Sequence, residues 1–311
     1  MNTHAIVGTD FSNAFSSILK NAAMLKTIGI MKISLVHVIN LRDVIMVEQF
    51  TIDGLEKKLA EQKSFLENLG IETEAELLYG IPYIELEKKR EESGAGVIII
   101  GSNGRTSSSS KIGGTTADIL ENLKAPVLVI TLRKEQHDPE NFHDKNLYQY
   151  ENIYKHLEKY EPEWEVKCSS VVDHVLLPTD FSDFSENAFQ WIKKLPVKIP
   201  KLTLLHVQDE VKIGSHLEHK LDEFNKIDTA RLIRIKESFR ASHPETPVDY
   251  KIIYGKPKEV IINFIKKENV TLTMMGSQGR GFFEEIFIGS VSHQVARNAD
   301  SNILIVPLPK T

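Results

Sequence analysis

The sequence is poor in several features that mark particular classes of protein. It has one cysteine, Cys168, so no intrachain disulfide can form, and a reducing compartment fits. No apolar run approaches the roughly 20 residues of a membrane-spanning helix, and the first residues, Met-Asn-Thr-His-Ala-Ile, lack a signal-peptide pattern. The formal net charge of −5 shows no basic excess, which argues against nonspecific nucleic-acid binding. We therefore expect a cytoplasmic protein that binds neither membranes nor nucleic acid.

What the chain does contain is one pattern that occurs twice in the same order. Thr9-Asp-Phe-Ser12 returns as Thr179-Asp-Phe-Ser182, and Ser34-Leu-Val-His-Val38 returns as Thr203-Leu-Leu-His-Val207. The length of 311 residues, with 41% apolar and 26% charged residues, suffices for two globular domains. The chain is therefore interpreted as one duplicated unit.

Short apolar segments alternate with amphipathic segments in both halves. The predicted strands are 4–9, 32–38, 72–78, 96–101 and 126–131, then 173–179, 201–207, 248–254, 271–276 and 303–307. Several are continuous apolar runs, which are typical of parallel strands covered on both faces. Helical stripes of apolar residues lie between them, at Ile52, Leu55, Leu59, Leu66 and Leu69, and at Leu217, Leu221, Phe224 and Ile227.

This alternation predicts an α/β fold of two tandem, doubly wound domains. We place them at 1–134 and 171–311. Residues 135–170 form a linker with a short helix.

The most specific repeat is a glycine loop after the fourth predicted strand of each half. Gly101-Ser-Asn-Gly104, nine residues and Gly114-Thr115 match Gly276-Ser-Gln-Gly279, nine residues and Gly289-Ser290. Glycines allow a phosphate to approach the backbone closely, and a helix N-terminus offers free N–H groups. The alternative is a plain turn with a helix cap, but two copies favour binding. Arg105 and Arg280 follow the second glycine and either reach a phosphate or lie in solvent.

Two further repeated elements meet these loops at the carboxyl edge of each sheet, where ligands bind in open α/β folds. Asp10 and Asp180, preceded by Thr9 and Thr179, end the first strands. They fit a ribose hydroxyl or a water-mediated metal contact, or else an Asx-turn. Val38 and Val207 end the second strands, where their backbone groups can contact an adenine edge.

The histidines and hydroxyls form no recognisable catalytic set. His37 and His206 are interpreted as hydrogen-bonded strand residues, and His216 and His219 as an exposed helix face without a third metal ligand. No Ser-His-Asp or Cys-His arrangement is indicated, so no catalytic residue and no protein-held metal are predicted.

Taken together, these motifs resemble the universal stress protein family, over nearly the whole chain. ATP-binding members carry Gly-x2-Gly-x9-Gly-(Ser/Thr), as at 101–115 and 276–290, an aspartate after the first strand, and a His-Val-like end to the second. The resemblance implies an adenine nucleotide alpha hydrolase-like fold, with a five-stranded parallel sheet of order 3-2-1-4-5 in each half. It also implies that strands 126–131 and 303–307 pair, giving an intramolecular pseudo-dimer.

The resemblance further implies adenine near the first two strand ends and phosphates in the glycine loop, often with Mg²⁺ or Mn²⁺. One site then holds Asp10, Val38, Gly101, Gly104, Gly114 and Thr115, and the other Asp180, Val207, Gly276, Gly279, Gly289 and Ser290. The first loop departs from the family, because it is serine-rich where bulky apolar residues are usual.

The expected function is binding of ATP, AMP or ADP in a regulatory role in the stress response. Two alternatives stay open, a slow metal-dependent ATPase and an interaction module that needs no nucleotide. The sequence also leaves open whether two chains form a homodimer.

Overall fold

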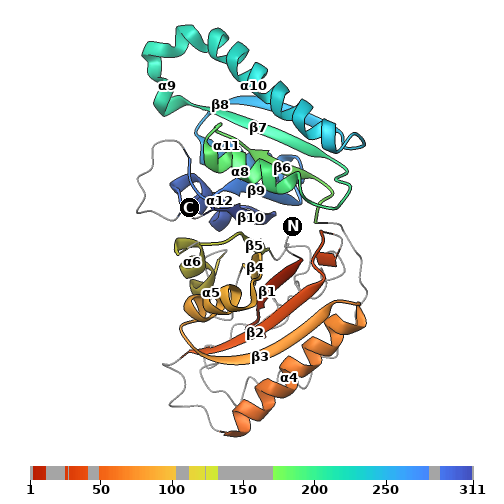
Figure 1. Cartoon of the computed structure of the whole chain (residues 1–311). Helices are drawn as coiled ribbons and strands as arrows, with labels where there is room; N and C mark the ends of the chain where they lie inside the picture. Colours follow the sequence, from red (N-terminus) through yellow and green to blue (C-terminus); the bar gives the residue numbers. More distant parts are fainter. Residues whose placement is uncertain are drawn as a thin grey trace.

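Ten strands pair into one continuous sheet, with helices on both of its faces (Figure 1). The structure is a computed structural model, and it describes residues 3–11, 25–26, 28–40, 49–102, 112–122, 124–131, 171–279 and 288–309. The predicted linker 135–170 lies outside these residues, and the domain boundaries remain a prediction.

The first half contains five strands in the spatial order 3-2-1-4-5, all parallel. Its elements are β1 (His4–Gly8), β2 (Lys32–Asn40), α4 (Gln49–Asn68), β3 (Glu72–Gly80), α5 (Pro82–Ser93), β4 (Val97–Gly101), α6 (Gly114–Glu121) and β5 (Val127–Ile130).

The second half repeats this arrangement. Its elements are β6 (Val175–Pro178), α8 (Asp183–Ile192), β7 (Leu202–Asp209), α9 (Glu210–Leu217), the 3₁₀ turn η2 (Glu218–Lys220), α10 (Leu221–Ser242), β8 (Val248–Gly255), α11 (Pro257–Lys267), β9 (Leu272–Gly276), α12 (Ser290–Asn298) and β10 (Asn302–Val306). The predicted tandem α/β fold is confirmed.

The two halves join edge to edge, through the antiparallel pair β5–β10. Leu304 lies opposite Leu128, Ile303 opposite Val129 and Ile305 opposite Val127. Val127 and Ile303 hold the same place in their own halves, because Val127 pairs with Ile98 on β4 and Ile303 with Thr273 on β9. The register is therefore symmetric about the Leu128–Leu304 pair, and the predicted pairing of the two last strands is observed.

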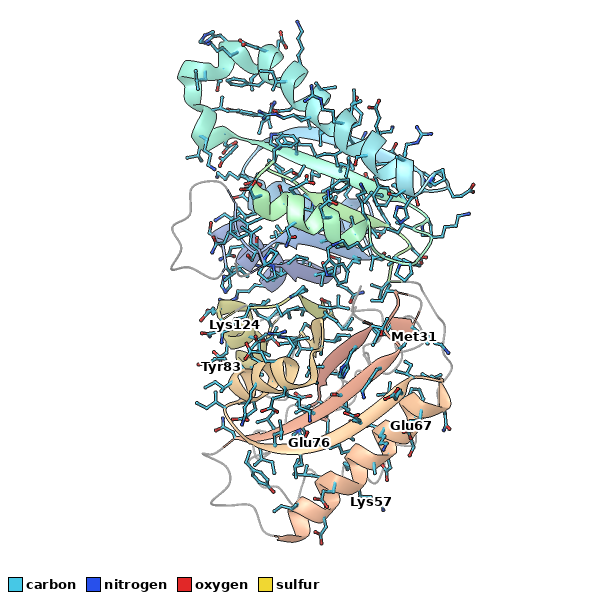
Figure 2. All side chains as sticks on the ribbon, in the orientation of Figure 1. Met31, Lys57, Glu67, Glu76, Tyr83 and Lys124 are labelled. Atoms are coloured by element: carbon cyan, nitrogen blue, oxygen red, sulfur yellow. The ribbon has the colours of Figure 1, made fainter. Side chains whose placement is uncertain are left out.

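Each face of the sheet carries its own apolar core. One core packs under α4, α8 and α10, and the other under α5, α6, α11 and α12. Side chains fill the space between sheet and helices on both faces, whereas charged residues of α4 such as Lys57 and Glu67 point to solvent (Figure 2).

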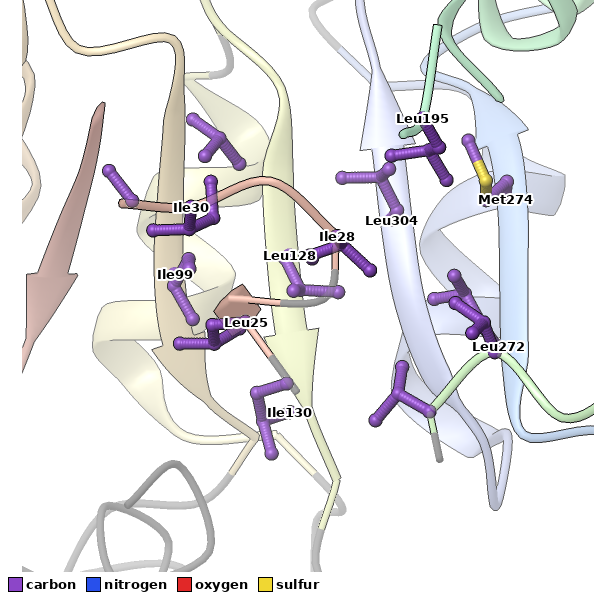
Figure 3. Close-up of a cluster of buried hydrophobic side chains, with 14 of the residues drawn as sticks. Leu25, Ile28, Ile30, Ile99, Leu128, Ile130, Leu195, Leu272, Met274 and Leu304 are labelled. Carbon is purple, nitrogen blue, oxygen red and sulfur yellow. The ribbon is translucent and has the colours of Figure 1, made fainter. Parts of the chain in front are cut away.

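The core under α4, α8 and α10 continues across the junction between the halves (Figure 3). Ile28 and Leu128 come from the first half, and Leu195 and Leu304 from the second, with exposed fractions of 6% or less. Burying a leucine completely contributes about 1.5–3 kcal/mol. The junction is therefore part of the hydrophobic core.

Of the two predicted apolar stripes on helices, the first is buried at three positions and the second is wrong. Leu55, Leu59 and Leu66 are buried along α4, as predicted. The stripe from Leu217 to Ile227 is wrong, because a 3₁₀ turn separates α9 from α10 and the side chain of Ile227 is 44% exposed. The buried face of α10 instead runs through Asp228, Leu232 and Phe239.

No helix in the described part of the chain is long and apolar enough to cross a membrane.

Candidate functional site

The Thr-Asp-Phe-Ser segment of the second half forms a tight turn at the carboxyl end of β6. The Thr179 amide donates to the carbonyl of Leu205 (2.8 Å), and the Thr179 hydroxyl accepts from the amide of Phe181 (3.0 Å). Phe181 has φ 60°, which is costly for a residue with a side chain and persists only where its surroundings hold it. The ring of His206 lies 4.5 Å from that of Phe181, and its Nδ1 lies 2.8 Å from the Thr179 carbonyl oxygen.

The first half builds the same turn at the end of β1. Phe11 has φ 56°, and its amide donates to the Thr9 hydroxyl (3.2 Å). The rings of His37 and Phe11 are tilted by 40° with their centres 4.5 Å apart, and Nδ1 of His37 lies 2.7 Å from the Thr9 carbonyl oxygen. His37 and His206 are therefore hydrogen-bonded strand residues, as predicted, and Asp10 and Asp180 occupy equivalent, partly buried positions.

The carboxylate of Asp180 faces two ways. Its Oδ1 accepts from the amide (3.1 Å) and the hydroxyl (2.6 Å) of Ser182, so the Asx-turn alternative is present. A Cβ atom added to Gly279 would lie only 2.7 Å from Oδ2. The structure thus brings the glycine loop against the predicted aspartate in the second half.

Gly276 has a different neighbour. An added Cβ would lie 2.6 Å from the carbonyl carbon and oxygen of Phe184, in the first turn of α8. This glycine is therefore needed for the packing of β9 against α8, which the sequence did not predict.

The two loops return to the sheet in the same way. The amides of Gly113 and Gly289 donate to the carbonyls of Ser102 and Ser277, both at 2.7 Å. Three residues after each of these glycines, a buried hydroxyl donates to the carbonyl that ends β4 or β9: Thr116 to Gly101 and Ser292 to Gly276, both at 2.8 Å.

These contacts correct the equivalence inferred from equal glycine spacing. Gly113, not Gly114, matches Gly289, so the first loop is one residue shorter. Gly114 then stands where the second half has Ser290, and Thr115 stands at the place of Val291. The first helical position of α6 therefore carries no hydroxyl, and Thr115 lies one position further along the helix.

The N-termini of α6 and α12 lie beside these loops without a side-chain cap. Their N-cap residues, Gly113 and Gly289, have extended backbones and make no side-chain hydrogen bond. The first amides of a helix have no partner within the helix, and an anion can satisfy them. Ser290 is the first residue of α12 and is exposed.

The backbone groups of Val38 and Val207 point past the ends of β1 and β6. The carbonyl of Leu205 points toward β6, because it accepts from Thr179, and backbone groups two residues apart point to the same side of a strand. The N–H and C=O of Val207 therefore point to that side, past the last residue of β6. Val36 accepts from Thr9 in the same way, so Val38 is placed likewise.

Comparison with known proteins decides the family. The model of the universal stress protein family matches residues 1–131 and again 172–307. The chain belongs to this family.

Its relatives match one half at a time or the whole chain. A universal stress protein of Methanocaldococcus jannaschii is 29% identical over 150 residues, which cover 42% of this chain and 93% of the relative. The universal stress protein YxiE of Bacillus subtilis is 29% identical over 143 residues, 42% of this chain and 97% of its own length. The crystal structure of a universal stress protein from Archaeoglobus fulgidus covers 99% of both chains, with a TM-score of 0.65 and 21% identity, and shares the fold.

Three predicted site residues of this universal stress protein lie outside the described residues: Gly104, Arg105 and Arg280. Among the described residues, no group of three or more histidine, cysteine, aspartate or glutamate side chains is arranged to hold a metal ion.

Sequence reasoning missed two other repeated features. The first is the pair of hydroxyls of Thr116 and Ser292, because equal glycine spacing aligns the two loops with an error of one residue.

The second is a pair of histidines, His4 and His174, at the amino ends of β1 and β6. The Nε2 atom of each lies 2.9 Å from a hydroxyl oxygen, that of Ser34 in the first half and that of Thr203 in the second. Burial lowers the pKa of both histidines. Their equal distance before Asp10 and Asp180 is a signal that could have revealed them.

Proposed function

We propose that the chain binds an adenine nucleotide, ATP above all, in a regulatory role in the stress response, and that the second half holds the tighter site. The observation that carries this proposal is the approach of Gly279 to the Asp180 carboxylate, beside an uncapped helix N-terminus. A polyphosphate is attracted to such a terminus by its free amides and its partial positive charge.

In the proposed site the backbone of Val207 contacts the adenine edge and Asp180, preceded by Thr179, contacts the ribose. The segment with Gly276, Gly279, Gly289 and Ser290, together with Arg280, binds the phosphates. Mg²⁺ or Mn²⁺ would be held mainly by the phosphates. The family membership supports nucleotide binding at this edge of the sheet. The uncapped N-terminus of α12 and the glycine backbone close to Asp180 fit a phosphate chain.

The first half offers a weaker version of the same site. It comprises Thr9, Asp10, Val38, Gly101, Gly104, Arg105, Gly114 and Thr115. It lacks a hydroxyl at the first helical position, because Gly114 stands there. We further propose that the two halves act as an intramolecular pseudo-dimer.

Equilibrium titration with labelled ATP tests the proposal. Gly279→Ala should weaken binding at least about tenfold, because the new methyl group displaces either Asp180 or the loop. Ser242→Ala, which removes an exposed hydroxyl at the far end of α10, should leave binding unchanged. Absence of binding to the unaltered chain, or equal affinity in Gly279→Ala, would refute the site.

A further inference from the structure

A cavity lies on the face of the sheet opposite Val207. It has a volume of about 290 Å³ and lies between α8 and α10, over the end of β6. Its floor is apolar and includes Leu177, Phe189 and Ile235. These residues belong to the core under α8 and α10, whereas Val207 packs on the core under α11 and α12. Thr179 also lines the cavity, so the cavity borders the proposed nucleotide site, but its floor lies on the other face of the sheet.

Two guanidinium groups line the cavity. Arg231 is held in place, because its Nη1 lies 3.5 Å from Oδ1 of the buried Asp228 and its guanidinium lies 5.2 Å from the centre of the Phe181 ring. Arg234 follows three positions later, so it lies on the same side of α10. Within the described part of the chain, Arg234 has no ion-pair partner.

One acidic group limits the charge that the cavity accepts. Glu186 lines it from α8, and the amide of Gln190 donates to Glu186 Oε1 at 2.6 Å. Asp228 offsets Arg231 and Glu186 offsets Arg234, so these four charged groups sum to zero before a ligand binds. Each negative charge on a ligand is then unbalanced, so a monoanion held by Arg234 is disfavoured less than phosphate, which carries more than one charge.

We infer that this cavity binds a small organic monocarboxylate whose apolar body rests on Leu177, Phe189 and Ile235. The carboxylate contacts Arg234, with Arg231 beside it, because a guanidinium is suited to carboxylate recognition. The cavity volume lies just below the usual range for ligand pockets, roughly 300–1,000 Å³, which restricts the ligand to the size of a single-ring acid.

Phenylacetate is a suitable probe, and the neutral phenylacetamide is its matched control. Both are titrated into the full chain without nucleotide and followed by saturation-transfer NMR. We expect phenylacetate to bind weakly, as befits a ligand of few atoms, and phenylacetamide to bind much less. Inorganic phosphate should not displace phenylacetate.

Substitutions on α10 assign the binding to the cavity. Arg234→Gln should weaken phenylacetate binding about tenfold, because it removes a charge-assisted hydrogen bond. Arg240→Gln, on the same helix but outside the cavity, should leave binding unchanged. Equal signals from acid and amide, no binding at millimolar phenylacetate, or unchanged binding in Arg234→Gln would each overturn the inference. None of these outcomes depends on whether ATP binds.

Discussion

Gly276 and Gly114 both belong to the repeated glycine pattern, but only Gly276 is required by close packing. An added Cβ at Gly276 would overlap the backbone of Phe184, whereas one at Gly114 would meet nothing within 4 Å. Gly276→Ala should therefore lower the free energy of unfolding by about 1–3 kcal/mol, through overpacking. Gly114→Ala should be neutral or slightly stabilising. Urea denaturation of both variants checks this, and equal stability of the two would contradict the close contact.

The buried histidine His174 makes the stability depend on pH. Its Nδ1 lies 3.0 Å from the carbonyl oxygen of Glu268, and burial lowers its pKa from the ordinary 6.5. Below about pH 6.5 the unfolded chain binds a proton that the folded chain excludes, so stability falls as the pH drops further. Above that pH this histidine has no effect.

Thermal unfolding midpoints between neutral and mildly acidic pH test this dependence. His174→Gln should reduce the loss on acidification, whereas His219→Gln, at an exposed position, should not. An unchanged acid response in His174→Gln would mean that other groups dominate.

The first residue of α6 is Gly114 and that of α12 is Ser290, because the loop before α6 is one residue shorter. This difference predicts that the two halves bind ATP with unequal affinity. Ser290→Gly should weaken ATP binding in the second half by about tenfold, the typical effect of losing one hydrogen bond to a charged group. Gly114→Ser should strengthen binding in the first half. The number of ATP molecules bound per chain, measured by native mass spectrometry across a titration, shows both effects. Equal occupancy of the halves in the unaltered chain would contradict the asymmetry.

The elements themselves were largely predictable from the sequence. Continuous apolar runs gave the ten strands, and the order within each half followed from the family resemblance. The apolar stripe from Leu217 to Ile227 was wrong, because apolar spacing alone does not reveal a 3₁₀ turn between helices. The equivalence of the two loops was also wrong: Gly113 and Gly114 are adjacent, and the hydrogen bonds of Gly113 to Ser102 and of Thr116 to Gly101 show that Gly113 matches Gly289. The contact between Gly276 and Phe184 joins segments far apart in the chain, which no local pattern reports.

At the scale of the whole molecule, the shared core predicts one cooperative unfolding transition. The exposed fraction of Leu304 is 2%, and its side chain packs in the core that crosses the junction of the halves. Leu304→Ala should cost about 2–5 kcal/mol and lower a single calorimetric midpoint for the entire chain. Ile233→Ala, at a 37% exposed position, should change it much less. Two separate transitions in the unaltered protein would contradict this expectation.

The symmetric register about Leu128 and Leu304 has a genetic consequence. Two identical subunits joined through such strands must carry the same loop twice, and they separate on dilution. In one continuous polypeptide the partners stay together at any concentration, and each copy accumulates changes independently. The one-residue difference in length between the loops before α6 and α12 is one such change, confined to a single copy.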